Sequence, residues 1–143
     1  MALAERMDRV GYRSPMRRVV ICTLLDACCV IAFVAIGRHT HGDGDSLAGI
    51  WHTAWPFLSG LAIGLLAVRF WRQPAAIRPA GIGAWVGAAG AGMVIRVLAG
   101  QGTAIAFIVV TFAFLALFIL GWRVIAQVGR HFRHSRRAGP WRG

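Results

Sequence analysis

One aspartate stands inside the first long apolar stretch of the chain, where its carboxylate could do chemistry. Counted from Val19, where the stretch begins, Asp26 lies about 10 Å along a helix that rises about 1.5 Å per residue. If the stretch crosses a bilayer, a carboxylate near its middle costs about 2.5–3.5 kcal/mol and should face other helices or a wet cavity. It either handles a proton or a cation, or it forms a structural hydrogen bond to another helix. Candidate partners are Ser59, Thr111 and Arg69.

A second group of chemistry-bearing side chains follows this stretch. It comprises Arg38, His39, His41, Asp43 and Asp45, with Arg96 expected at the same level from a later helix. Alternating histidine and aspartate offers ligand types that divalent metals accept, but the spacing matches no recognised zinc site and the intervening glycines indicate a flexible loop. We therefore expect no metal, and predict that the two arginines pair with the two aspartates.

Other catalytic signals are absent from the sequence. Cys22, Cys28 and Cys29 all lie in the first apolar stretch, and their odd number without a Cys-x-x-Cys spacing indicates buried thiols rather than a disulfide framework. No phosphate-binding glycine loop, serine nucleophile elbow or carboxylate pair occurs. We expect that the protein is not an enzyme and that it binds no cofactor.

The composition indicates which elements must position these side chains. Of 143 residues 57% are apolar and 15% charged, with 18 glycines in addition, whereas soluble domains are about 45–50% apolar with glycine counted. Residues 19–37, 54–71, 81–98 and 103–122 form four apolar stretches long enough to cross a bilayer. The sequence predicts an all-α integral membrane bundle of four transmembrane helices, with basic tails at residues 1–18 and 123–143.

The arginines predict the orientation of this bundle. The 16 basic residues are all arginine, and all but Arg38 and Arg96 lie in the two tails or near the second connection. Cytoplasmic segments are enriched in Lys and Arg, so both termini should be cytoplasmic. A cleaved secretory signal is a weaker alternative, because its apolar core would exceed the 7–15 residues that signals use.

Small residues recur at helical spacing in the second and third stretches. They are Gly60, Gly64, Ala84, Ala88 and Gly92. Such residues let helix backbones approach closely, so they indicate either tight packing within the bundle or a face for self-association.

The C-terminal tail carries Arg130, Arg133, Arg136 and Arg137 directly after the last apolar stretch. A basic segment beside a membrane helix favours the headgroups of anionic lipid, at about 1 kcal/mol per residue. We expect no nucleic acid as a partner.

Several short segments resemble a family of small bacterial membrane proteins, the domain of unknown function 3054 family. The likeness rests on Asp26 with residues 37–42, residues 53–57 with Gly60, residues 92–93 with Arg96, residues 102–104 with Phe107, and residues 121–123. The resemblance implies a four-span membrane protein, largely of actinobacteria and their relatives, and supplies no reaction and no ligand.

Together these features predict a non-enzymatic integral protein of the bacterial cytoplasmic membrane that acts as an oligomer or with a membrane partner. The alternative is a small transporter or channel subunit in which Asp26 handles a proton or a cation and Arg38 and Arg96 shape the outer mouth. A membrane enzyme that uses a metal on the histidine–aspartate loop is a third, weaker hypothesis.

Overall fold

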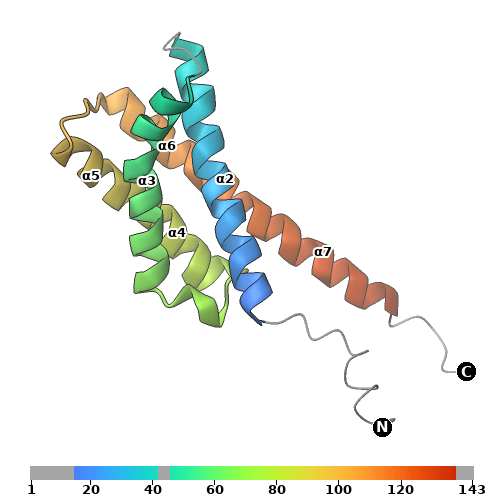
Figure 1. The fold of residues 1–143 in the computed structure, drawn as a ribbon. Coiled ribbons are helices and arrows are strands. Elements are labelled where there is room, and N and C mark those ends of the chain that lie inside the picture. The colour runs from blue at the N-terminus through green and yellow to red at the C-terminus, as the bar shows by residue number, and fades with distance from the viewer. Residues whose placement is uncertain (1–14, 42–45, 138–143) are drawn as a thin grey trace, which may run out of the picture.

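Four long helices account for most of the computed structural model, which describes residues 15–41 and 46–137 (Figure 1). The first is α2 (Pro15–His41) and the second is α3 (Leu47–Ala67), which a short 3-10 turn, η1 (Phe70–Arg72), follows. The third comprises η2 (Ile77–Gly81), α4 (Ile82–Val86), η3 (Gly87–Ala91) and α5 (Gly92–Leu98). The fourth comprises α6 (Ile105–Leu115), η4 (Ala116–Leu120) and α7 (Gly121–Arg137).

Each of these helices is long and apolar enough to cross a membrane. The qualifying segments are Met16–Thr40, Leu47–Ala67, Ile77–Leu98 and Ile105–Phe132. No strand occurs within the described residues. The predicted all-α bundle of four membrane helices is therefore confirmed.

The second helix begins at Leu47, earlier than the predicted residue 54, because the Ser46 side chain caps it. Its hydroxyl oxygen accepts a hydrogen bond from the Gly49 N–H at 3.2 Å. Pro56 therefore lies inside the helix and cannot donate to the carbonyl of His52, four residues earlier. The Gln101 side-chain amide donates to that carbonyl instead, at 2.9 Å. This bond ties the connection before α6 to the first half of α3.

Glycines let the second and third helices cross with their backbones in contact. Gly60 and Gly64 of α3 face Gly83 and Gly87, and a Cβ atom added at Gly87 would lie 2.6 Å from the Gly64 Cα. Gly92 sits equally close to α3, against the backbone of Phe57. In the third helix η3 has π-helical hydrogen bonding and lies at this crossing, while η2 contains a kink at Arg78, whose backbone is extended.

The two alanines of the predicted stripe, Ala84 and Ala88, are completely buried in the bundle. Together with the glycine contacts, this means that the small-residue stripes are already occupied by contacts between helices of one chain.

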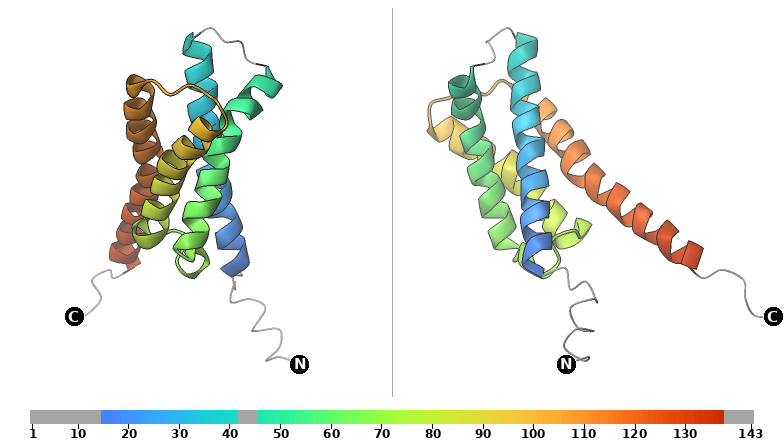
Figure 2. Two further views of the ribbon diagram at one scale, coloured as in Figure 1. Left: turned by 90° about the vertical axis from the view of Figure 1, so that its left-hand side faces the viewer. Right: turned by 45° about the vertical axis from the view of Figure 1, so that its right-hand side comes forward.

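The fourth helix does not end near residue 122 but continues to Arg137. Its last part, α7, leaves the bundle and diverges from α2 (Figures 1 and 2). The start of α2 and the end of α7 lie at the same end of the bundle (Figure 2), as an even number of antiparallel helices requires.

Candidate functional site

A buried ion pair joins the first and last helices. Asp26 of α2 and Arg123 of α7 are both completely buried. The two Nη atoms of Arg123 donate to the two carboxylate oxygens of Asp26, Nη1 at 2.6 Å and Nη2 at 2.7 Å. This bidentate arrangement is the strongest form of the arginine–carboxylate contact.

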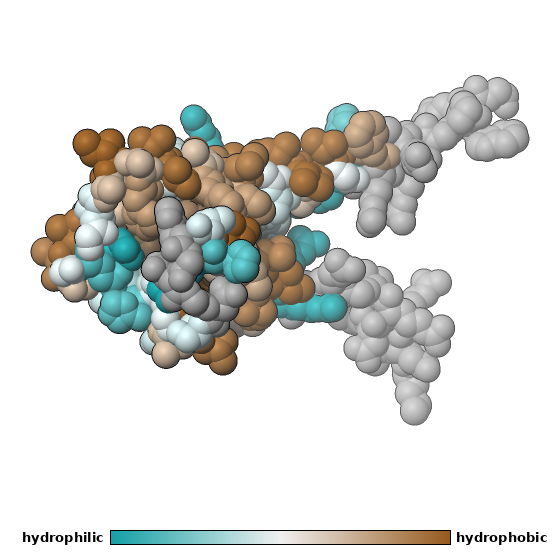
Figure 3. Space-filling model, turned by 90° about the horizontal axis from the view of Figure 1, so that it is seen from above, coloured by the Kyte–Doolittle hydropathy of each residue, from teal (hydrophilic) through white to brown (hydrophobic). Residues whose placement is uncertain are grey.

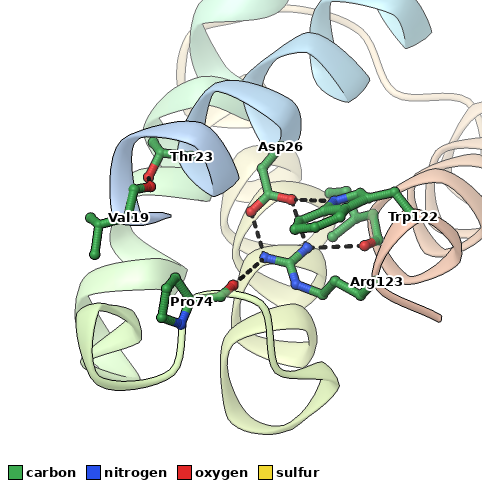
Figure 4. A network of polar contacts seen from close by, with 7 residues as sticks. Val19, Thr23, Asp26, Pro74, Trp122 and Arg123 are labelled. Atoms are coloured by element: carbon green, nitrogen blue, oxygen red, sulfur yellow. Dashed lines mark hydrogen bonds and ion pairs between the residues drawn. The ribbon is translucent and has the colours of Figure 1, made fainter. Parts of the chain in front are cut away.

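The side chain of Trp122 completes the enclosure of the pair (Figure 4). Its indole N–H donates to Oδ1 of Asp26 at 2.9 Å, and the Arg123 guanidinium lies 4.4 Å from the centre of its ring. The adjacent residues Trp122 and Arg123 therefore hold one carboxylate from two directions, and the ring contributes a cation–π contact.

Neighbouring backbone fixes the position of the guanidinium. Nη1 of Arg123 also donates to the carbonyl of Ile119 at 2.9 Å, and Nη2 reaches the carbonyl of Pro74 at 3.5 Å. Gly81 packs against the same side chain, since a Cβ atom added there would lie 2.8 Å from Arg123 Cδ. Five segments thus meet at this pair: α2, the turn before η2, η2 itself, η4 and α7.

The two interpretations of Asp26 differ in what they require of its oxygens. Both oxygens are bonded, to Arg123 and Trp122, which favours a structural contact between helices over a proton or cation site. None of the three predicted partners bonds Asp26. Thr111 donates to the Phe107 carbonyl of its own helix, Ser59 lies with Trp51 and Trp55 at a surface pocket, and Arg69 is exposed.

Sequence reasoning missed Arg123 because it counted that residue among the arginines that set the orientation. The available signal was the segment 121–123, one of the stretches on which the family resemblance rests. The helix was also expected to end at residue 122, which placed Arg123 in a solvated tail.

Arg38 and Arg96 lie at the opposite end of the bundle from the start of α2. Arg96 donates from Nη1 to the Gln101 side-chain oxygen at 2.6 Å and from Nε to the Gly102 carbonyl at 3.2 Å. Its guanidinium lies 4.8 Å from the centre of the Phe107 ring. Arg38 donates from Nη1 to the Thr53 hydroxyl at 3.3 Å.

Both arginines line a cavity of about 800 Å³ between α2 and α6. Its polar lining comes from Arg38, Thr40, Thr53, Arg96 and Thr103, and its apolar walls include the rings of Phe33, Phe107 and Phe114. Figure 3 looks onto this end of the bundle and shows hydrophilic side chains gathered over it, with apolar side chains around the rim.

Much of the predicted outer cluster lies outside the described residues. This holds for Asp43, Asp45 and the side chain of His41, so their predicted pairing with arginines stays a prediction, while His39 is exposed. Within the described residues no group of three or more His, Cys, Asp or Glu could hold a metal, and the three cysteines are free.

Of the four arginines predicted to bind lipid, Arg130 is exposed on α7. The side chains of Arg133, Arg136 and Arg137 lie outside the described part of the chain. Their contact with headgroups stays a prediction.

Comparison with known proteins gives one match. Residues 23–126 match the family described as "Protein of unknown function (DUF3054)". The match covers most of the chain, including Asp26, Trp122 and Arg123. No curated protein and no solved structure matches.

Proposed function

The chain belongs to the DUF3054 family, whose description names no activity, and from its geometry we propose a function by association. In this proposal it is a non-enzymatic, multi-pass protein of the bacterial cytoplasmic membrane. It acts there by binding a second copy of itself or another membrane protein.

The observation that carries this proposal is the exposed apolar row on α7. Val124, Ile125, Val128 and Phe132 recur at helical spacing and are between 45% and 75% exposed. Residues three and four apart share one face of a helix. Helices in a bilayer associate by van der Waals packing of their side chains rather than by a hydrophobic drive from water.

The buried ion pair supports this role because it fixes the base of α7. Arg123 and Trp122 hold the first turn of α7 against α2, and beyond that turn the helix diverges from the bundle (Figure 1). The projecting face is therefore held at one angle to the bundle. A face oriented in advance loses less entropy on binding.

The orientation belongs to the same proposal. α2 begins and α7 ends at one end of the bundle, and the excess of arginine at that end supports a cytoplasmic placement. Arg130 on α7 would then meet the anionic headgroups of the inner leaflet. The transporter alternative gains no support, since both oxygens of Asp26 are bonded and Asp26 does not line the cavity.

The test compares two bulky substitutions in the full chain, extracted from its native membrane in mild detergent. Ile125→Trp enlarges a side chain in the α7 row, and Val109→Trp makes the matched change at an exposed position of α6. Native mass spectrometry should show a dimer or a co-purified protein for the wild type. We expect the Ile125→Trp complex to be at least fivefold less abundant, with Val109→Trp unchanged. A wild type found only as a lone monomer, or equal losses in both variants, would overturn the proposal.

A further inference from the structure

A cavity lies between α2 and α6, and no residue of α7 lines it. Its size and its lining are those of a binding site. Its volume of about 800 Å³ lies within the range of about 300–1,000 Å³ that small-molecule sites occupy. Along α6 the lining runs from Ala106 to Phe114, about 12 Å at about 1.5 Å per residue. Its long axis therefore follows the helices.

The two ends of this cavity differ in chemistry. Arg38 and Arg96 lie near the outer ends of their membrane segments, Met16–Thr40 and Ile77–Leu98, at the level expected for lipid headgroups. The rings of Phe33, Phe107 and Phe114 line the part that runs toward the middle of the bundle. A cavity with polar groups at one end and apolar walls beyond them suits an amphipathic molecule, whose polar head and apolar tail match these two parts.

Arg96 gives the polar end its charge preference. It is half-buried, and its hydrogen bonds go to two neutral acceptors, the side chain of Gln101 and the carbonyl of Gly102. No ion pair of Arg96 occurs within the part of the chain that the structure describes. A partly desolvated guanidinium with neutral partners is a favourable place for an anion.

We propose that this cavity binds a phospholipid with an anionic headgroup from the surrounding bilayer. The phosphate lies at Arg96 and Arg38, at the end of the cavity that Thr40 and Thr53 also line. This placement replaces the predicted pairing of the two arginines with Asp43 and Asp45. One hydrocarbon chain extends along the cavity over the rings of Phe33, Phe107 and Phe114. The Phe33 ring contacts the other two, so that the three rings form one apolar wall. The bound lipid thereby keeps the orientation that it has in the outer leaflet.

The experiment uses phosphatidylglycerol with a photoreactive group in one acyl chain. This lipid is mixed with the full-length protein in bilayer discs. After irradiation, the labelled peptides are mapped by mass spectrometry. We expect label on the lining segments 33–40 and 103–114, at least fivefold above the label from phosphatidylcholine with the same chain. Equal labelling by the two lipids would overturn the anionic preference, and no label on these segments would overturn the site.

Matched variants separate the contribution of the lipid headgroup from that of the acyl chain. Arg96→Gln should abolish the preference for phosphatidylglycerol, Arg96→Lys should retain most of it, and Arg72→Gln, at an exposed arginine outside the lining, should not change it. Ala106→Trp fills the cavity and should reduce labelling by both lipids at least fivefold, while Ala113→Trp, on α6 but not in the lining, should not. Displacement of the lipid by glycerol phosphate alone would identify a free phosphate ligand and contradict the lipid assignment.

Discussion

The pairing of Asp26 with Arg123 shows how strongly one contact constrains a membrane helix. Each charge alone in the bilayer interior is costly, and the bidentate geometry at 2.6 and 2.7 Å compensates both. Removing one partner leaves the other buried and uncompensated, which in proteins costs more than the intact pair contributes.

We therefore expect Asp26→Asn to destabilise the protein by about 3–5 kcal/mol. The double variant Asp26→Leu with Arg123→Met should recover much of this loss, because it leaves no unpaired charge. The measurement is the midpoint of thermal unfolding by circular dichroism in detergent. A double variant less stable than Asp26→Asn would show that the charges do more than pair with each other.

Arg123→Lys tests the geometry of the pair rather than its charge. Lysine keeps the positive charge but cannot bond both carboxylate oxygens in a fork or stack its head flat on Trp122. We expect a stability between those of the wild type and Asp26→Asn, by the same unfolding measurement. Full wild-type stability would mean that charge alone is sufficient here.

The crossing of α3 with the third helix depends on the absence of side chains. Gly64→Ala would place a Cβ atom against the backbone of Gly83 and Gly87, where only movement of a whole helix can relieve the contact. Overpacking of this kind costs about 1–3 kcal/mol. Gly129→Ala is the matched control, because nothing lies within 4 Å of its Cβ position.

In that comparison Gly64→Ala should lower the unfolding midpoint clearly. Gly129→Ala should leave it unchanged or raise it, since alanine favours the helix over glycine by about 1 kcal/mol. Equal effects from the two substitutions would contradict the close crossing.

Pro56 and Gln101 together couple α3 to the connection before α6. The proline leaves the His52 carbonyl without its helical donor, and Gln101 supplies one at 2.9 Å. Gln101→Ala should cost about 1 kcal/mol, and less in a Pro56→Ala background, where the helix can bond that carbonyl itself. A double-mutant cycle of unfolding midpoints measures this coupling, and additive effects would refute it.

The whole molecule has an orientation that reporter fusions can test. A reporter that is active only in the cytoplasm should work when fused at Arg78. A reporter that is active only outside should work at Gly100, in the connection between the third and fourth helices. The opposite pattern would invert the orientation, and with it the leaflet assigned to the cavity and to Arg130.

Much of the fold was predictable because it depends on local patterns. Each of the four apolar stretches has the length of a membrane span and predicts a helix by itself. The unequal distribution of arginine between the two ends of the bundle predicts the direction of these helices. The ends of the helices were less predictable. Ser46 starts the second helix early, and α7 continues beyond the apolar stretch through Arg123, whose charge is neutralised by a residue 97 positions away.

Local sequence patterns are sufficient to predict a bundle of four membrane helices and a shielded Asp26, because hydropathy and the cost of a charge in a bilayer are properties of single segments. The fold itself settles what shields Asp26, which glycines face each other, and that α2 and α6 line a cavity. Those outcomes depend on the rotation and crossing of helices distant in the chain, which no local pattern specifies.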